Sequence, residues 1–135
     1  EEARAWYQEN QMPLFTWSSI ANGFFTGKVR RDNYKQLVEE GVLDGSSATA
    51  YCTPDNFKRL DRVETLAKEK KMTIPQIALA YVLNQPLNIF PLVGARNGDE
   101  ITANLQSLDT KLSQNEMAWL DLKLSRKPTR SKGGK

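Results

Sequence analysis

The fold class of this chain is decided by one stretch, Pro91-Leu92-Val93-Gly94-Ala95-Arg96-Asn97-Gly98-Asp99-Glu100-Ile101-Thr102-Ala103-Asn104. The apolar run Ile89 to Val93 leads into it and predicts a buried strand. A glycine turn follows, and the spacing then predicts a helix over Asp99 to Leu108, with Asn97 as its N-cap and Glu100 three residues later. A strand that passes directly into a helix indicates an α/β protein.

The turn between that strand and that helix has the features of an anion site. Backbone N–H groups at a helix N-terminus are unpaired and the helix dipole is positive there, so a phosphate binds well. Arg96 adds a permanently charged partner that can donate two hydrogen bonds to a phosphate. The same spacing also fits an ordinary turn with a surface arginine, because any α/β protein contains several such turns.

Helix and strand signals continue on both sides of this stretch. Thr73 with Gln76 and Ser113 with Glu116 are two capping boxes, each of which predicts a helix start. Leu14 to Trp17 is interpreted as a second strand, and Asn22 to Gly45 as a long, partly regular loop. Further helices are expected over Glu1 to Asn10, around Asn33 to Glu40, and from Thr53-Pro54 to the lysines at 68–71.

Two strands are few for so many helices. The helix containing Ile77 to Leu83 is apolar almost all round and must be buried, yet two parallel strands offer little sheet to cover it. At 135 residues the chain is also well short of the roughly 250 residues of a complete (β/α)8 barrel. The pattern therefore predicts part of a larger parallel α/β fold.

Three blocks of sequence, in order, share a resemblance. They are Gly94-Ala95-Arg96-Asn97 with the helix that reaches Asn104, the block Leu14 to Lys28 with its Gly23-Phe24-Phe25-Thr26-Gly27-Lys28 ending, and the helix Thr73 to Leu83. Together they closely resemble the aldo-keto reductases over residues 1–122. The resemblance implies a partial (β/α)8 TIM barrel, made of its last two strands with flanking helices. The composition of residues 123–135, which is basic and lacks acidic side chains, separately predicts a disordered tail.

The resemblance also implies a binding site for NADP(H). Trp17 would stack on the nicotinamide ring, and Ser18, Ile20 and Asn22 would wrap the pyrophosphate. Gly94, Ala95, Arg96 and Asn97 match the cradle of the adenosine 2′-phosphate, which favours NADP over NAD. Glu100 and Asn104 complete the set, and Asn104 is placed to bind the adenine.

Three positions in these blocks depart from the family pattern. Ser19 stands where proline is usual, and Ala103 replaces the acid that binds the adenine amine. Glu100 holds a place usually taken by glutamine or arginine, and its charge would repel the phosphate unless it turned away to cap the helix. Lys28 fits either a phosphate contact or a solvated lysine. These departures bear on the affinity for the adenosine end of the cofactor.

The catalytic residues of the family are not expected in this chain. The family reduces small carbonyl substrates with a tyrosine acid helped by aspartate, lysine and histidine, which lie in the first half of the barrel. This chain has no histidine, and its four tyrosines match no catalytic pattern. The fragment alone is expected to be inactive, and either to need a missing N-terminal half or to self-associate. Two alternatives are a non-catalytic, reductase-like binding or regulatory module and an unrelated small α/β domain.

Composition limits the remaining classes of function. Five positive charges follow Ser125, and without them 14 basic residues face 16 acidic ones. No aromatic residues are interleaved with the basic ones, so a nucleic-acid site is not indicated. No apolar run approaches the ~20 residues that span a membrane. The single cysteine, Cys52, lies in a stretch expected to be irregular, and it fits a reducing compartment, the cytoplasm.

Overall fold

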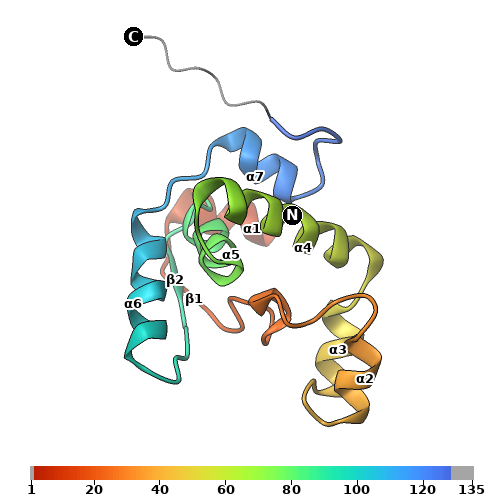
Figure 1. The fold of residues 1–135 in the computed structure, drawn as a ribbon. Coiled ribbons are helices and arrows are strands. Elements are labelled where there is room, and N and C mark those ends of the chain that lie inside the picture. The colour runs from red at the N-terminus through yellow and green to blue at the C-terminus, as the bar shows by residue number, and fades with distance from the viewer. Residues whose placement is uncertain (1, 129–135) are drawn as a thin grey trace.

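The computed structural model describes residues 2–128, and Figure 1 shows the arrangement of their helices and strands. The elements, in chain order, are α1 (Glu2–Asn10), β1 (Leu14–Thr16), the 3₁₀ helix η1 (Phe24–Thr26), α2 (Tyr34–Glu39), α3 (Gly45–Tyr51), α4 (Pro54–Lys70), α5 (Ile74–Leu83), β2 (Ile89–Pro91), α6 (Gly98–Gln106), the 3₁₀ helix η2 (Ser107–Asp109) and α7 (Gln114–Leu120). This order is the mixed α/β pattern that the sequence predicts.

The sheet consists of β1 and β2, which pair in parallel with Leu14 opposite Ile89 and Phe15 opposite Phe90. Both strands are shorter than expected, because Trp17, Leu92 and Val93 lie beyond their ends. The expectation that Ile89 to Val93 is buried is also wrong, since Phe90, Leu92 and Val93 are exposed. Within residues 2–128 each strand has one neighbouring strand, so one edge of each is unpaired. Phe15 and Phe90, on one face of the sheet, are exposed.

The first hydrophobic core lies between α4, α5 and α7, which Figure 1 shows stacked on one side of the strands. Its fully enclosed members include Leu66 of α4 and Ile77 of α5, and Trp119 of α7 closes it. The prediction that the apolar helix Ile77 to Leu83 is buried is confirmed for Ile77 to Ala80, whereas the last turn is half-buried. Packing on neighbouring helices thus supplies much of the cover that the short sheet cannot.

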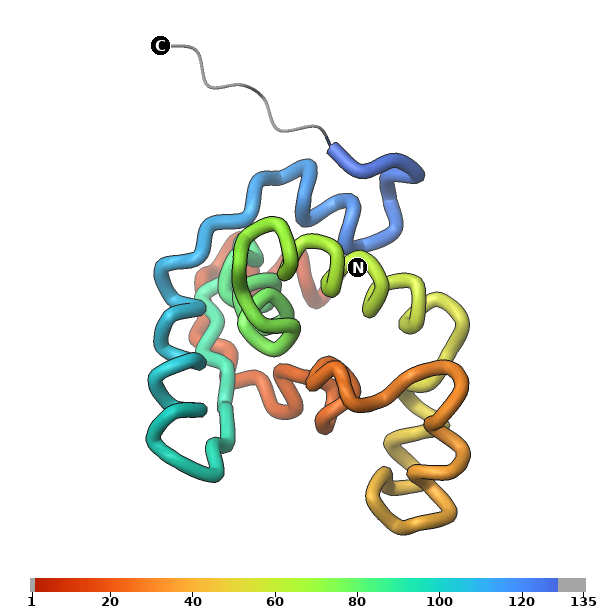
Figure 2. The backbone as a smooth tube through the Cα atoms, in the orientation of Figure 1, coloured from red at the N-terminus to blue at the C-terminus, as the bar shows by residue number. Residues whose placement is uncertain are grey.

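A second core holds the segment between β1 and α4. Phe24 of η1 contacts Phe57 of α4, with ring centroids 5.3 Å apart, and Val29, Leu43 and Leu60 fill the space around them. Figure 2 shows the α2–α3 part of this segment on the opposite side of the molecule from α6. From Asn22 to Gly45 the chain is partly regular, as the sequence predicts, and α2 lies within the helix expected around Asn33 to Glu40.

Helix α3 is the element that the sequence analysis missed. It begins after Asp44, whose carboxylate accepts a hydrogen bond from the backbone N–H of Ser47 at 2.9 Å. Its sequence, Gly-Ser-Ser-Ala-Thr-Ala-Tyr, has no apolar stripe, so periodicity gives no signal there. Cys52, expected in an irregular stretch, is the half-buried C-cap of this helix.

The predicted helix starts are confirmed. Thr53 caps α4, and the two capping boxes at Thr73 and Ser113 are both formed. Asn97 caps α6 by accepting from the backbone N–H of Glu100 at 3.0 Å. The helix expected over Asp99 to Leu108 starts one residue earlier and ends as α6 at Gln106, and the chain then tightens into η2.

Contacts with the body continue past residue 122. Leu124 packs against the first core, and Arg62 of α4 donates to its carbonyl oxygen at 2.8 Å. Lys127 forms an ion pair with Glu69. Most of the tail that the sequence predicts to be disordered, residues 129–135, lies outside the described residues. None of the helices within 2–128 has the length and apolar character needed to cross a membrane.

Candidate functional site

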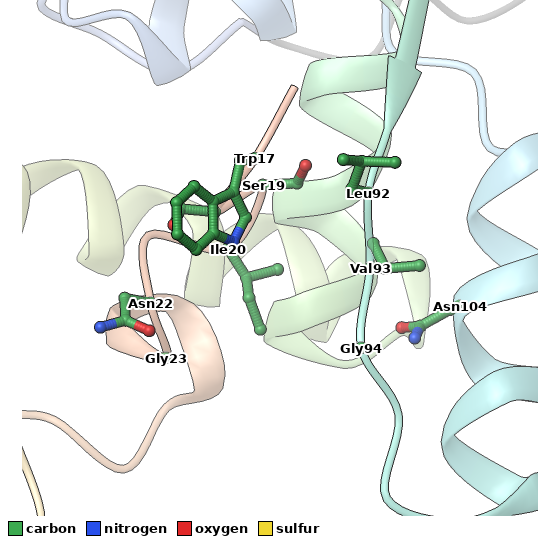
Figure 3. Close-up of a pocket in the computed structure, with 10 residues that line it drawn as sticks. Trp17, Ser19, Ile20, Asn22, Gly23, Leu92, Val93, Gly94 and Asn104 are labelled. Carbon is green, nitrogen blue, oxygen red and sulfur yellow. The ribbon is translucent and has the colours of Figure 1, made fainter. Parts of the chain in front are cut away.

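The loops that follow β1 and β2 open onto one pocket of about 250 Å³. Because the two strands are parallel, their carboxyl ends lie at the same end of the sheet, where the loops of such folds meet. Figure 3 shows Trp17, Ile20 and Asn22 on one wall, and Leu92, Val93 and Gly94 with Asn104 of α6 on the other. The remaining lining residues are Ser18, Ser19 and Gly23.

The pocket gathers six of the ten residues that the sequence analysis singled out: Trp17, Ser18, Ile20, Asn22, Gly94 and Asn104. The other four, Ala95, Arg96, Asn97 and Glu100, continue from Gly94 into the first turn of α6 and lie outside its lining. Ala95 instead lines an adjoining apolar groove of about 500 Å³ between α5, β2 and α6. The structure therefore divides the predicted residues between a pocket and an exposed turn.

The wall formed by the β1 loop has an unusual backbone. Ser18, Ala21 and Asn22 have φ angles of 56°, 54° and 49°, a left-handed conformation that side chains other than glycine seldom adopt. Gly23 and Gly27, on either side of η1, adopt the same region without that cost. Such strain persists only where the surroundings hold it, and it concentrates at binding sites.

Hydrogen bonds hold this loop in place. The Ser19 hydroxyl donates to the carbonyl oxygen of Thr16 at 3.2 Å, which ties the loop to the end of β1. The side-chain amide of Asn22 donates to the Ser47 hydroxyl of α3 at 2.6 Å. Helix α3, which the sequence analysis missed, thus positions one of the predicted site residues.

Trp17 is 87% exposed and belongs to neither hydrophobic core. It follows the last residue of β1, and its indole forms part of the pocket wall. Trp119, in contrast, is buried in the first core. An exposed indole beside a pocket offers a flat apolar surface for an aromatic ring to stack on.

Arg96 and Glu100 form a hydrogen-bonded ion pair at the start of α6. The Glu100 carboxylate accepts from the backbone N–H of Arg96 at 2.8 Å and from its guanidinium Nε and Nη2 at 2.9 and 2.5 Å. The hydrogen bonds from Arg96 hold the pKa of Glu100 below its ordinary value, and the charge of Lys28 adds to the effect. The N-cap of this helix is Asn97, as the sequence predicts, and the Glu100 side chain is turned toward Arg96.

The position of α6 beside the pocket depends on Gln76. This buried side chain donates to the Ala103 carbonyl oxygen at 3.0 Å and to Oε1 of Gln106 at 2.7 Å, while its own Oε1 completes the Thr73 capping box. One side chain therefore joins α5 to the turn of α6 that carries Asn104.

A second pair of polar groups was not anticipated. The Tyr81 hydroxyl of α5 donates to Asp121 after α7, and both residues line a pocket of about 310 Å³ with Arg59. Burial, with the hydrogen bond to Asp121, raises the pKa of Tyr81 to about 12. The two residues are 40 positions apart, so no local signal links them. No group of side chains among the described residues is arranged to hold a metal ion.

Comparison with known proteins gives matches that cover most of this chain. The model of the aldo/keto reductase family matches residues 1–124. The chain is 31% identical over 110 residues, 77% of its length, to a probable aldo-keto reductase of Glycine max, 30% of which is covered. It is 29% identical over 111 residues to a probable aryl-alcohol dehydrogenase of Saccharomyces cerevisiae, with 82% of this chain and 33% of the relative covered.

A third relative is named as a channel subunit and not as an enzyme. It is a probable voltage-gated potassium channel subunit beta of Oryza sativa subsp. japonica, 25% identical over 114 residues, with 76% of this chain and 32% of the relative covered. The chain thus spans about a third of the length of each of these three relatives.

Proposed function

Since this chain belongs to the aldo/keto reductase family, we propose that it is the NADP(H)-binding, C-terminal part of a (β/α)8 barrel that reduces aldehydes and ketones. The observation that carries this proposal is the meeting of the β1 and β2 loops in one pocket, lined by six of the residues expected to bind the cofactor. The cytoplasm remains the expected compartment, on the basis of the single cysteine.

The residues present fit a nicotinamide cofactor. Beside Gly94 the space is open, so a ligand can approach the backbone closely. The pocket, at about 250 Å³, suits one portion of a dinucleotide and leaves the rest to lie on the exposed surface toward Arg96. The bound cofactor would supply the hydride, and the protein would supply orientation and charge.

Each part of the site has a distinct task in this proposal. The exposed indole of Trp17 orients the nicotinamide ring by stacking. The loop residues Ser18, Ile20 and Asn22 wrap the pyrophosphate, and Gly94 begins the turn that cradles the 2′-phosphate. The Ala95–Asn97 turn and the start of α6 attract the 2′-phosphate, with Arg96 as its charged partner and Asn104 on the adenine side. The proton donor would come from outside these residues.

Cofactor titration of Arg96→Ala tests the proposal. The variant is expected to bind NADPH roughly 10- to 100-fold more weakly, the range of a charge-assisted hydrogen bond, and to bind NADH almost unchanged. Arg31→Ala is the matched control, because Arg31 also forms a two-bond pair with a carboxylate, that of Asp61, and lies outside the pocket. Equal losses for both cofactors in Arg96→Ala would contradict the 2′-phosphate assignment.

The second candidate function is a non-catalytic, reductase-like binding or regulatory module. It is favoured by the similarity to a probable potassium channel subunit and by the departures at Ser19, Glu100 and Ala103. Reading the coding sequence upstream of Glu1 separates the two candidates. A barrel half with aspartate, tyrosine, lysine and histidine in the family pattern would support the reductase, and its absence would support the module.

A further inference from the structure

The Glu100 side chain behaves differently from the two side chains at the same position of other helices. In α5 and α7 the third helical residue, Gln76 or Glu116, accepts from the backbone N–H of the N-cap, at 2.8 and 2.7 Å. In α6 the carboxylate of Glu100 passes the N-cap and accepts from the N–H of Arg96, the residue before it. The same carboxylate holds the Arg96 guanidinium.

The groups bound by Glu100 are the ones that a phosphate would need. A phosphate at this turn would take a backbone N–H before the helix and the guanidinium of Arg96. Both already donate to one carboxylate, with N···O distances between 2.5 and 2.9 Å. The charge of Lys28, in the segment after β1, makes a further small contribution to lowering the pKa of this carboxylate. The positive charge of Arg96 is therefore already paired with an anion of the protein itself, the Glu100 carboxylate.

We propose that Glu100 is a specificity-determining residue that occupies the phosphate position as an internal anion and keeps the preference for NADPH over NADH small. The inference rests on the proposed function, because it assigns the 2′-phosphate to the Arg96 turn. A 2′-phosphate must displace the carboxylate from Arg96 and then remain beside a like charge. NADH has no phosphate at this position and meets neither obstacle.

Glu100→Gln tests the inference directly, since it removes the charge with almost no change in shape. Calorimetric titration is expected to show about tenfold tighter binding of NADPH, in line with the loss of a close like charge, and NADH binding changed less than twofold. Glu116→Gln is the matched control, because it makes the same change at the same helical position of α7. It should leave both affinities unchanged.

The double variant Arg96→Ala/Glu100→Gln shows whether the effect of Glu100 on NADPH binding depends on Arg96. If Glu100 acts by occupying Arg96, the gain in NADPH affinity should fall to a small fraction of that seen with Arg96 present. A Glu100→Gln variant with an unchanged or lower ratio of NADPH to NADH affinity would overturn the inference, as would an equal gain for both cofactors. Failure of the proposed function is recognised separately, because Arg96→Ala alone would then weaken both cofactors equally.

Discussion

Tyr81 and Asp121 illustrate how one residue acquires its chemistry from a distant partner. Tyr81 of α5 is half-buried, and its hydroxyl donates to the carboxylate of Asp121 at the end of α7. Burial and this hydrogen bond both favour the neutral phenol, which is why the pKa rises to about 12. The Tyr81 hydroxyl therefore keeps its proton at neutral pH, where it joins α5 to the end of α7, and loses it only in strong alkali.

This pair predicts a stability change at high pH. The folded pKa of Tyr81 lies above its ordinary value of about 10, so the folded state keeps a proton that the unfolded chain releases. The contribution is complete below about pH 10 and is lost as the pH rises toward 12. Urea denaturation should show that wild-type stability falls more steeply across this interval than that of Tyr81→Phe. Parallel curves would contradict the role of Tyr81.

Trp17 yields a second prediction for a single residue. Its fluorescence is expected to be quenched when the cofactor binds, because the nicotinamide ring would lie against the exposed indole. Trp6 on α1 and the buried Trp119 on α7 should contribute little to the change. Titration of Trp17→Phe with NADPH provides the check. Retention of the full quench in this variant would mean that the indole does not stack on the cofactor.

At the scale of elements, capping chemistry sets the helix ends and one buried amide joins two helices. Thr73, Asn97 and Ser113 each cap the helix that the sequence assigns to them. Gln76 does more than complete its capping box, because its amide also bonds the backbone and a side chain of α6. The wall of the pocket that carries Asn104 is thereby fixed to the first core.

Loss of Gln76 is expected to affect stability more than loss of a cap alone. Gln76→Ala removes the capping box and leaves the carbonyl of the half-buried Ala103 without this donor, so a cost of about 1–3 kcal/mol in unfolding free energy is expected. Thr73→Ala should cost about 1 kcal/mol, the ordinary value for an N-cap. Urea denaturation of both variants measures the difference. A Gln76→Ala cost no larger than that of Thr73→Ala would contradict the bridging role.

At the scale of the whole molecule, apolar residues gather on the surface around the sheet. Phe15 and Phe90 stack on each other with 65% and 46% of their surface exposed, and Leu92 and Val93 continue the patch. Ile101, Leu105 and Leu108 line the adjoining groove of about 500 Å³. A continuous apolar face of this kind marks a contact surface, and strand edges without partners add to it.

The 135-residue chain alone is therefore expected to self-associate or to need the remaining half of a barrel. Burial of the exposed face is favourable by about 25 cal/mol per Å². Sedimentation at micromolar concentration should show species larger than a monomer, and Phe15→Ser/Phe90→Ser should reduce them. Val42→Ser is the control, because Val42 is an exposed apolar residue between α2 and α3 and is not part of this face. A monomer with a cooperative melt would contradict the interpretation as a partial barrel.

The sequence by itself determined the family and the helix starts. Caps depend on residues within three positions of each other, so Thr73 with Gln76 and Ser113 with Glu116 could be identified without a structure. The three ordered motifs identified the family, and six of the ten predicted site residues do line one pocket. Helix α3 was missed because its seven residues carry no apolar stripe that periodicity could detect.

Only the tertiary structure decided the exposure of the strands, the Tyr81–Asp121 pair and the partner of Glu100. Burial of a strand depends on which elements cover it, and the apolar pattern of Ile89 to Val93 is the same whether they are present or not. Tyr81 and Asp121 meet because α5 and α7 pack on the same core. Glu100 can reach either the N-cap or Arg96, and spacing cannot choose between two donors that lie equally within reach of one carboxylate.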